Sequence, residues 1–236
     1  MGKIKRKRSY GSKKRPLRSL KRRLYSKKKR AKRSYANGQV SGMPRARRTT
    51  LRYSDHYPTV TSTLGTVTNY FFKANGLHDP DAQAGGHQPM GRDQWALFYN
   101  HYTVVGAIIR IRIMPNNGNV VPCMAGVYLN ADGTSTMTTP AQFIEQKRGM
   151  YRQFHGGESR PITLVCKFSA RKFFGCKNPE DREDLGASLT TSADPTELAY
   201  FNFWFLTMDS STHSVNVTFS IDYRVKFREP KTLAQS

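Results

Sequence analysis

Four clusters of lysine and arginine near the start of the sequence offer the clearest chemistry in the chain. Closely spaced cationic side chains neutralise phosphate groups and release the counterions condensed on a nucleic acid. The resulting binding is strong, depends on salt and is independent of base sequence. The side chains that we expect to make these contacts are Lys5, Arg6, Lys7, Arg8, Lys13, Lys14, Arg15, Lys21, Arg22, Arg23, Lys27, Lys28, Lys29, Arg30, Lys32 and Arg33.

Three tyrosines, Tyr10, Tyr25 and Tyr35, alternate with these clusters. Aromatic rings stack on unpaired bases of any identity, so this interleaving favours a single-stranded ligand. The same basic clusters are typical of nuclear-localisation signals, which would make a host nuclear import receptor a second partner. An anionic membrane surface is the weaker alternative, because the segment has no regular apolar face.

The charge of the chain is divided sharply between two parts. Residues 1–52 contain 22 lysines and arginines, and the first acidic residue is Asp55. The remainder contains 17 basic and 16 acidic residues. A segment with so many like charges and so few apolar side chains cannot offset the entropy lost on ordering, so we expect residues 1–52 to form a disordered arm. Residues 53–236 are long enough for one folded domain.

Residue types that suit a metal ion gather in one predicted loop. His78, Asp79, Asp81 and His87 could hold a divalent cation, but loops rich in proline and glycine commonly contain such residues, so we expect no metal there. The sequence contains no dinucleotide-binding, P-loop, serine-hydrolase or zinc-protease motif. We therefore expect neither a cofactor nor enzymatic activity.

The three cysteines, Cys123, Cys166 and Cys176, form no CxxC pair, and their odd number argues against a disulfide framework. We expect them to be small buried residues of a protein made in a reducing compartment. The sequence also lacks an apolar run of about 18 residues and an apolar N-terminal segment of the secretory type, so we expect no membrane insertion.

The sequence from Leu64 onward predicts the β-rich domain to which the arm is attached. In segment 107–113 isoleucines alternate with Arg110 and Arg112, which is typical of a strand with one buried and one exposed face. Segment 215–221 shows the same alternation. The predicted strands are Leu64–Ala74, Tyr102–Met114, Val121–Leu129, Met150–His155, Pro161–Phe168, Arg171–Cys176, Leu198–Met208 and Ser214–Phe227.

Short helices are predicted between these strands. Asp93 is placed to cap one or two helical turns, and Thr139 followed by Pro140 is typical of the start of a helix over 141–147. A third helix is predicted over 180–184. Eight strands with long connections and little helix indicate an all-β fold. We expect an eight-stranded antiparallel jelly-roll sandwich with short helices in its loops and a disordered basic N-terminal arm.

Several aromatic residues are candidates for contacts outside the domain. In segment 201–205 the phenylalanines share one face of a predicted strand and Trp204 points to the other, which favours Trp204 as a contact with another subunit or with nucleic acid. Trp95 and Tyr99 lie in a short aromatic-rich segment that can pack beneath the sandwich or cross a subunit interface. The candidate interface residues are thus Trp95, Tyr99 and Trp204.

The segments 71–81 (FFKANGLHDPD), 86–95 (GHQPMGRDQW) and 98–102 (FYNHY) form a block of motifs. This block resembles capsid proteins of circular, Rep-encoding single-stranded DNA (CRESS-DNA) viruses of the circovirus-like kind, and the similarity extends over the arm and the strand series. The resemblance implies a single jelly-roll shell protein, an icosahedral virion of about sixty copies, an arm that faces the interior, and packaging of circular DNA in the host nucleus.

Other kinds of protein share parts of this pattern. Coat proteins of small RNA viruses combine similar folds with basic arms, so the cargo can be DNA or RNA. A nuclear shuttle protein would bind DNA without forming closed particles. A chromatin or ribosomal type of binder would do the same and would have a basic face on its folded domain as well. The near-neutral balance after residue 52 argues against such a face.

Overall fold

The computed structural model describes residues 43–232, apart from residues 84, 117–120, 135–136, 147, 158–159 and 192. The arm side chains predicted to contact nucleic acid all precede Met43 and lie outside the described residues. The described residues form a two-layer β-sandwich, and no helix among them is long and apolar enough to cross a membrane.

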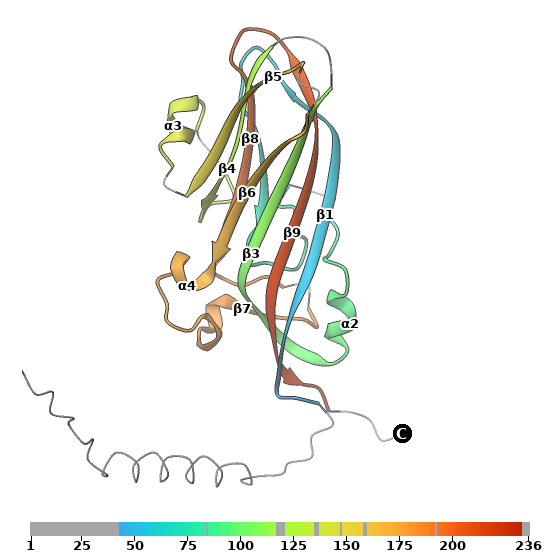
Figure 1. Cartoon of the computed structure of the whole chain (residues 1–236). Coiled ribbons are helices and arrows are strands. Elements are labelled where there is room, and N and C mark those ends of the chain that lie inside the picture. Colours follow the sequence, from blue (N-terminus) through green and yellow to red (C-terminus); the bar gives the residue numbers. More distant parts are fainter. Residues whose placement is uncertain are drawn as a thin grey trace, which may run out of the picture. The chain divides into compact units, whose positions relative to one another are not determined.

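Two antiparallel sheets make up the sandwich (Figure 1). The first sheet has the order β1 (Ala46–Ser62), β9 (His213–Pro230), β3 (Tyr99–Pro115) and β6 (Ile162–Ser169), with the short β7 (Gly186–Ser188) also paired to β3. The second sheet has the order β2 (Thr68–Lys73), β8 (Tyr200–Thr207), β4 (Pro122–Asn130) and β5 (Gly149–His155).

The strands pair in a nested order. β1 pairs with β9, β2 with β8, β3 with β6 and β4 with β5, as they do when one long antiparallel hairpin is rolled up. This connectivity defines a jelly roll, so the predicted all-β jelly-roll sandwich with short helices is confirmed. Seven of the eight predicted strands correspond to observed strands whose ends differ by a few residues.

The core between the sheets is rich in aromatic rings. Phe219 of β9 lies among three of them, with ring centroids 4.5 Å from Phe72, 5.2 Å from Tyr57 and 5.3 Å from Phe203. Rings at these separations and tilted angles combine a large buried apolar area with favourable edge-to-face contacts. Strands from both sheets supply the rings, so their packing holds the two layers together.

The predicted alternation in β3 and β9 is confirmed. Isoleucines at positions 109, 111 and 113 are fully buried, whereas Arg110 and Arg112 are exposed. The odd-numbered residues of segment 215–221 are also fully buried. These two neighbouring strands therefore turn one face to the core and the other to solvent, as their sequences indicate.

The strand that follows the arm, β1, is not among the predicted strands. Leu51, Tyr53 and Val60 are buried, but the polar residues Thr49 and Asp55 share the inward-facing positions with them and hide the alternation. A bulge between Tyr57 and Val60 also shifts the register. Residues 46–52, which the charge pattern assigns to the arm, belong to this strand because they pair with β9.

The predicted strand Arg171–Cys176 is wrong, because helix α4 (Ala170–Phe173) occupies the first part of this segment. The pairing of β6 with β3 ends at Ser169, so the ladder on that side does not continue into the segment. Phe173 instead turns back onto Phe168, with their ring centroids 5.8 Å apart. Packing against the core thus overrides the local strand preference of a phenylalanine-rich segment.

The other helical segments lie near their predicted positions. Thr139 precedes its helix as predicted, and its backbone N–H donates a hydrogen bond to Gln142 Oε1 at 3.2 Å. Asp93 lies in the first helical turn rather than at the cap, which is Gly91. The segments are α2 (Arg92–Ala96), α3 (Pro140–Ile144) and the 3₁₀ helices η1 (Pro179–Asp181) and η2 (Glu183–Leu185).

We expect Phe219→Ala to lower the free energy of unfolding by about 3–5 kcal/mol, because the cavity would open where rings from both sheets meet. Denaturant unfolding of the unassembled chain, followed by circular dichroism, measures this loss. Tyr151→Ala is the control, since Tyr151 is 44% exposed, and it should cost less than about 1 kcal/mol. Equal losses in the two variants would contradict the central position of Phe219.

Candidate nucleic-acid interface

The outer surface of the first sheet carries a band of cationic side chains. Side chains alternate along a strand, so the pairing register places the even-numbered residues of β9 on the outer face beside those of β1. Exposed cations of β3 and β6 extend this face. We define the basic face by Arg48, Arg52, Arg110, Arg112, Lys167, Arg224, Lys226 and Arg228.

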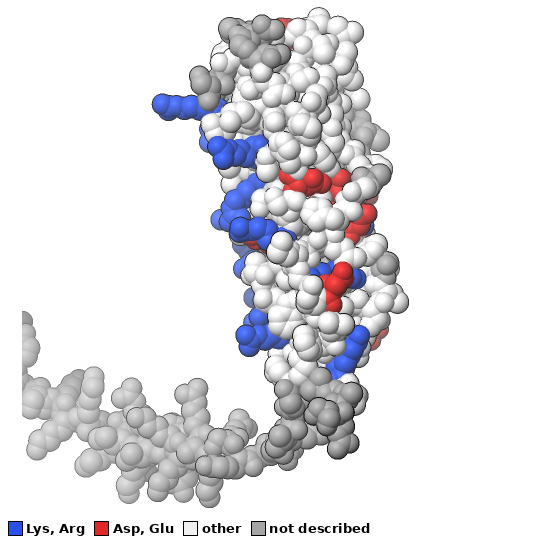
Figure 2. All heavy atoms as spheres, turned by 90° about the vertical axis from the view of Figure 1, so that its right-hand side faces the viewer, with Lys and Arg blue, Asp and Glu red and all other residues white. Residues whose placement is uncertain are grey.

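The cations of the basic face gather on one side of the domain, although the total charge of the chain after residue 52 is nearly neutral. Figure 2 looks onto the β1 edge, and the lysines and arginines gather along its left-hand side, which is the side turned to the viewer in Figure 1. Within strands β1, β3, β6 and β9, Asp222 is the one acidic residue that the register places among these cations. The near-neutral balance after residue 52 therefore does not exclude a basic face.

Asp222 lies within the basic face and pairs with two arginines. Arg52 Nε donates a hydrogen bond to Asp222 Oδ1 at 2.6 Å, and Arg110 donates one to Oδ2. The hydrogen bond from Arg52 is the main cause that lowers the pKa of Asp222. Partial burial opposes this shift, and the hydrogen bond from Arg110 adds to it. The carboxylate is therefore ionised at neutral pH and bridges β1 and β3 across β9.

Glu180 of η1 compensates further charge at one end of the basic face. Arg48 Nη2 donates a hydrogen bond to Glu180 Oε1 at 2.5 Å, and Lys226 donates one to Oε2. Burial raises the pKa of Glu180, but the two cationic donors together outweigh burial, so the pKa is lowered. Arg228 donates to the backbone carbonyl of the same residue.

Four cations of the basic face have no acidic side-chain partner within 4.0 Å in the described part of the chain: Arg228, which donates to a backbone carbonyl, and Arg112, Lys167 and Arg224. Arg224 lies across Gly106 of β3, where a Cβ atom would be 2.5 Å from its Nη2 atom, so the glycine leaves room for it. The eight cations of the basic face thus outnumber the carboxylates beside them, which are Asp222, Glu180 and, at the end near Arg228, Glu229. Such an excess is suited to a polyanion.

Trp204 points away from the core between the sheets, as its position in the strand predicts, but it is covered. Helix α3 places Phe143 against it, with ring centroids 4.7 Å apart, and the residue is 1% exposed. Gly126 on the neighbouring strand leaves space for the indole, since a Cβ atom there would lie 2.5 Å from it. Trp204 is therefore a buried residue and not the surface residue that the interface hypothesis requires.

Trp95 and Tyr99 pack together at one end of the first sheet. Trp95 stacks on Phe227 with ring centroids 4.9 Å apart and is partly exposed. Tyr99 is fully buried, and its hydroxyl donates a hydrogen bond to the carbonyl of Pro44 at 3.0 Å. Packing thus accounts for Tyr99, while an interface role for Trp95 stays a prediction.

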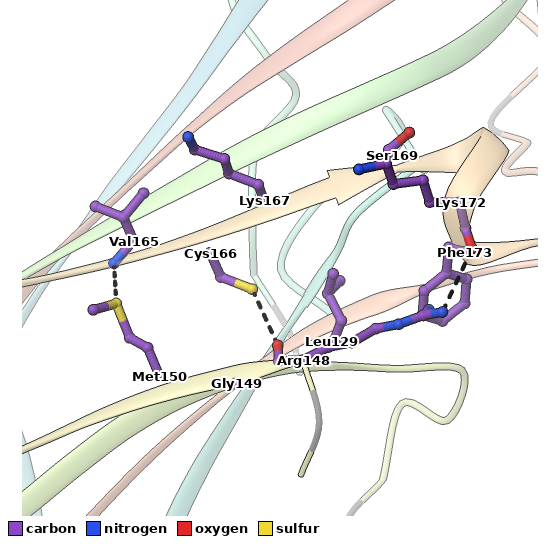
Figure 3. Close-up of a pocket in the computed structure, with 10 residues that line it drawn as sticks. All are labelled: Leu129, Arg148, Gly149, Met150, Val165, Cys166, Lys167, Ser169, Lys172 and Phe173. Carbon is purple, nitrogen blue, oxygen red and sulfur yellow. Dashed lines mark hydrogen bonds between the residues drawn. The ribbon is translucent and has the colours of Figure 1, made fainter.

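A pocket of about 560 Å³ lies between β5 and β6 (Figure 3). The Val165 N–H donates to Met150 Sδ at 3.0 Å, and Cys166 Sγ donates to the Arg148 carbonyl at 3.6 Å. Burial raises the pKa of Cys166 to about 11, so this thiol stays protonated at neutral pH and is a poor nucleophile. The pocket is lined by Leu129, Arg148, Gly149, Met150, Val165, Cys166, Lys167, Ser169, Lys172 and Phe173.

The loop after β2 holds the histidines and aspartates that have metal-ligand chemistry. Asp81 accepts hydrogen bonds from the Tyr57 hydroxyl and, at 3.0 Å, from the Gln83 backbone N–H. The His87 ring packs against Tyr53, with centroids 4.7 Å apart. Among the described residues, no three His, Cys, Asp or Glu side chains form a group that could hold a metal ion.

Comparison of the sequence with protein-family models and with curated proteins gives no match. Among solved structures, Mud crab tombus-like virus aligns at 11% identity and a TM-score of 0.46, covering 87% of this chain and all of that one. Macrobrachium rosenbergii nodavirus aligns at 12% identity and 0.45, covering 86% and 93%. Desmodium yellow mottle tymovirus aligns at 13% identity and 0.38, covering 85% and 100%. These TM-scores are below 0.5, so the function proposed below depends on this chain's own residues.

We expect the ion pairs of Asp222 to make stability depend on pH. Because its pKa is lowered in the folded chain, they stabilise the fold above the ordinary carboxyl value of 3.8 and are lost as pH falls through the lowered pKa. Urea unfolding of the unassembled chain between about pH 5 and pH 2 should show a smaller loss of stability in Asp222→Asn than in the unchanged protein. Asp132→Asn, which changes an exposed carboxylate elsewhere, should keep the original pH dependence.

Proposed function

We propose that this chain is the coat protein of a small icosahedral virus, in which the jelly-roll domain builds the shell and the basic arm packages the genome. The observation that carries this proposal is the joining of a jelly-roll domain to a segment with 22 cationic residues and no acidic residue. The segment requires a polyanion, and a sandwich with loops at both ends is a suitable building block.

Assembly and packaging are coupled in this proposal. If about sixty arms meet inside one shell, about 1,320 positive charges face a single cavity. An empty shell is then opposed by electrostatic repulsion, which a packaged nucleic acid relieves while it releases its own counterions. Closed particles should therefore form most readily around nucleic acid.

The proposal also extends to the kind of nucleic acid that the shell packages. The motif block in segments 71–81, 86–95 and 98–102 supports circular single-stranded DNA, and the basic clusters support entry into the host nucleus through an import receptor. The tyrosines in the arm support a single-stranded ligand of either kind. A coat protein of a small RNA virus is the alternative that shares the fold and the arm.

A nucleic-acid binder that forms no shell is the second candidate, and the basic face favours it. A basic folded domain is what a chromatin-type or shuttle protein would present, so the charge balance after residue 52 no longer separates the two functions. The formation of closed particles does separate them.

We expect electron microscopy of the purified full-length chain to show uniform closed shells. Nucleic acid extracted from authentic particles should be degraded by DNase and resist RNase. Degradation by RNase alone would assign the chain to an RNA virus. Monomers or dimers at both low and high salt, with nucleic acid present, would contradict the coat function and favour the shuttle or chromatin-type binder.

We expect deletion of residues 1–35 to leave a folded domain that no longer retains nucleic acid, because the deletion removes all four basic clusters. The ratio of absorbance at 260 nm and 280 nm in purified particles or soluble protein measures the retained nucleic acid. Circular dichroism of the deletion variant controls for folding. Full retention of nucleic acid by a folded deletion variant would overturn the role of the arm.

A further inference from the structure

We infer that the basic face is a second nucleic-acid contact surface, which holds the phosphate backbone of the strand that the arm binds. The inference rests on the proposed function and extends it from the arm to the folded domain. Its ligand is a single-stranded polynucleotide recognised through phosphate groups. Charge, accessibility, chain connection and surface composition each support this assignment.

The charge of the basic face is incompletely compensated and accessible. Arg112, Lys167 and Arg224 are exposed and have no acidic partner within 4.0 Å among the described residues. The paired arginines also remain open, since the side chains of Arg48 and Arg52 are 72% and 67% exposed. A guanidinium has five N–H donors, so an arginine that pairs with one carboxylate can still bind a phosphate oxygen.

The arm and the basic face are connected through one strand. In the sequence, β1 is the first strand after the arm clusters, and it forms an edge of the first sheet. Arg48 and Arg52 therefore belong both to the 22 charges of residues 1–52 and to the basic face. In the sequence, residues 34–44 carry no charge and separate the last basic cluster of the arm from the cations that begin at Arg45, so a polynucleotide held by both the arm and the sheet spans this short neutral segment.

The composition between the cations favours phosphate over a second copy of the chain. Thr50, Thr163, Thr218 and Ser220 lie on the outer face of the same strands, and hydroxyl groups bind phosphate oxygens. The centre of a protein interface is usually depleted of charge and enriched in aromatic residues. Neither property describes this face, and two copies joined through it would bring like charges together.

Phosphate recognition by this face is independent of base sequence. The outward positions of the four long strands carry no phenylalanine, tyrosine or tryptophan to stack on a base, whereas the arm has its three tyrosines. The arm is thus suited to both bases and phosphates, and the sheet to phosphates alone.

The test compares two triple variants of the full-length chain that lose the same charge. The face variant combines Arg112→Gln, Lys167→Gln and Arg224→Gln. The control variant combines three substitutions of exposed cations outside the basic face, Arg152→Gln, Arg160→Gln and Lys177→Gln. The probe is a fluorescently labelled oligothymidine, and fluorescence anisotropy gives its affinity for unassembled protein at a series of salt concentrations.

The expected result is a change in the salt dependence of binding. Loss of three phosphate contacts to a single strand should reduce the slope of log K against log salt by about 2 in the face variant, and affinity at low salt should fall. The control variant should keep the original slope. Equal slopes in the two triple variants would overturn the inference, whatever the common value is.

A second test removes a negative charge from the basic face by a single substitution, which should strengthen the binding of oligothymidine. Asp222→Asn removes the carboxylate that pairs with Arg52 and Arg110, so affinity and slope should both increase. Asp132→Asn removes an exposed carboxylate outside the basic face and should leave both unchanged. A structural role for Asp222 alone predicts no gain, so unchanged or weaker binding in a folded Asp222→Asn variant would contradict the inference.

Whether closed particles form separates a failure of this inference from a failure of the proposed coat function. An unchanged chain that binds oligothymidine but forms no shells under any salt condition would refute the coat function and leave the basic face testable by the same slopes. If the unchanged chain forms shells and the face variant does not, while its oligothymidine slope is unchanged, then the basic face joins copies of the chain and the inference fails.

Discussion

The position of β9 between β1 and β3 is the constraint on which the rest of the structure depends. Side chains on a strand alternate with a period of two, so one register decides both what is buried and what is displayed. In the observed register Phe219 lies beside Ile111 in the core, while Thr218 lies beside Arg112 on the outside. A slip by one residue would bring arginines into the apolar layer, where an unpaired charge costs several kcal/mol. The aromatic core and the basic face are two sides of the same pairing.

The charge of the molecule is organised at two levels. The arm concentrates cations in sequence, so its character can be read from composition alone. The sheet concentrates cations in space by bringing together four strands whose sequences each contain few of them. Asp222 and Glu180 hold several of these cations in place without cancelling the excess. Strand β1 belongs to both levels, because it continues the basic segment and pairs within the sheet.

Much of the fold could be predicted from local sequence because β3 and β9 alternate cleanly and Thr139 with Pro140 begins a helix. Strand β1 escaped prediction because Thr49 and Asp55 make two of its inward positions polar and a bulge breaks its period. The burial of Trp204 depends on a helix from a distant connection, which a strand pattern cannot reveal. The basic face required the pairing register, since the alternation of Arg110 and Arg112 marks only one of its four strands.

The nested order of the strands also determines when the domain can exist during protein synthesis. β1 leaves the ribosome about 150 residues before its partner β9, and β2 similarly precedes β8. The first sheet therefore lacks its central strand until residues 213–230 have been synthesised. Such long-range pairing is slow to form, because the chain loses the entropy of closing a long loop before the stabilising contacts between the strands are made. A chain synthesised only as far as β8 would therefore carry all the basic clusters but lack the strand that joins β1 to β3.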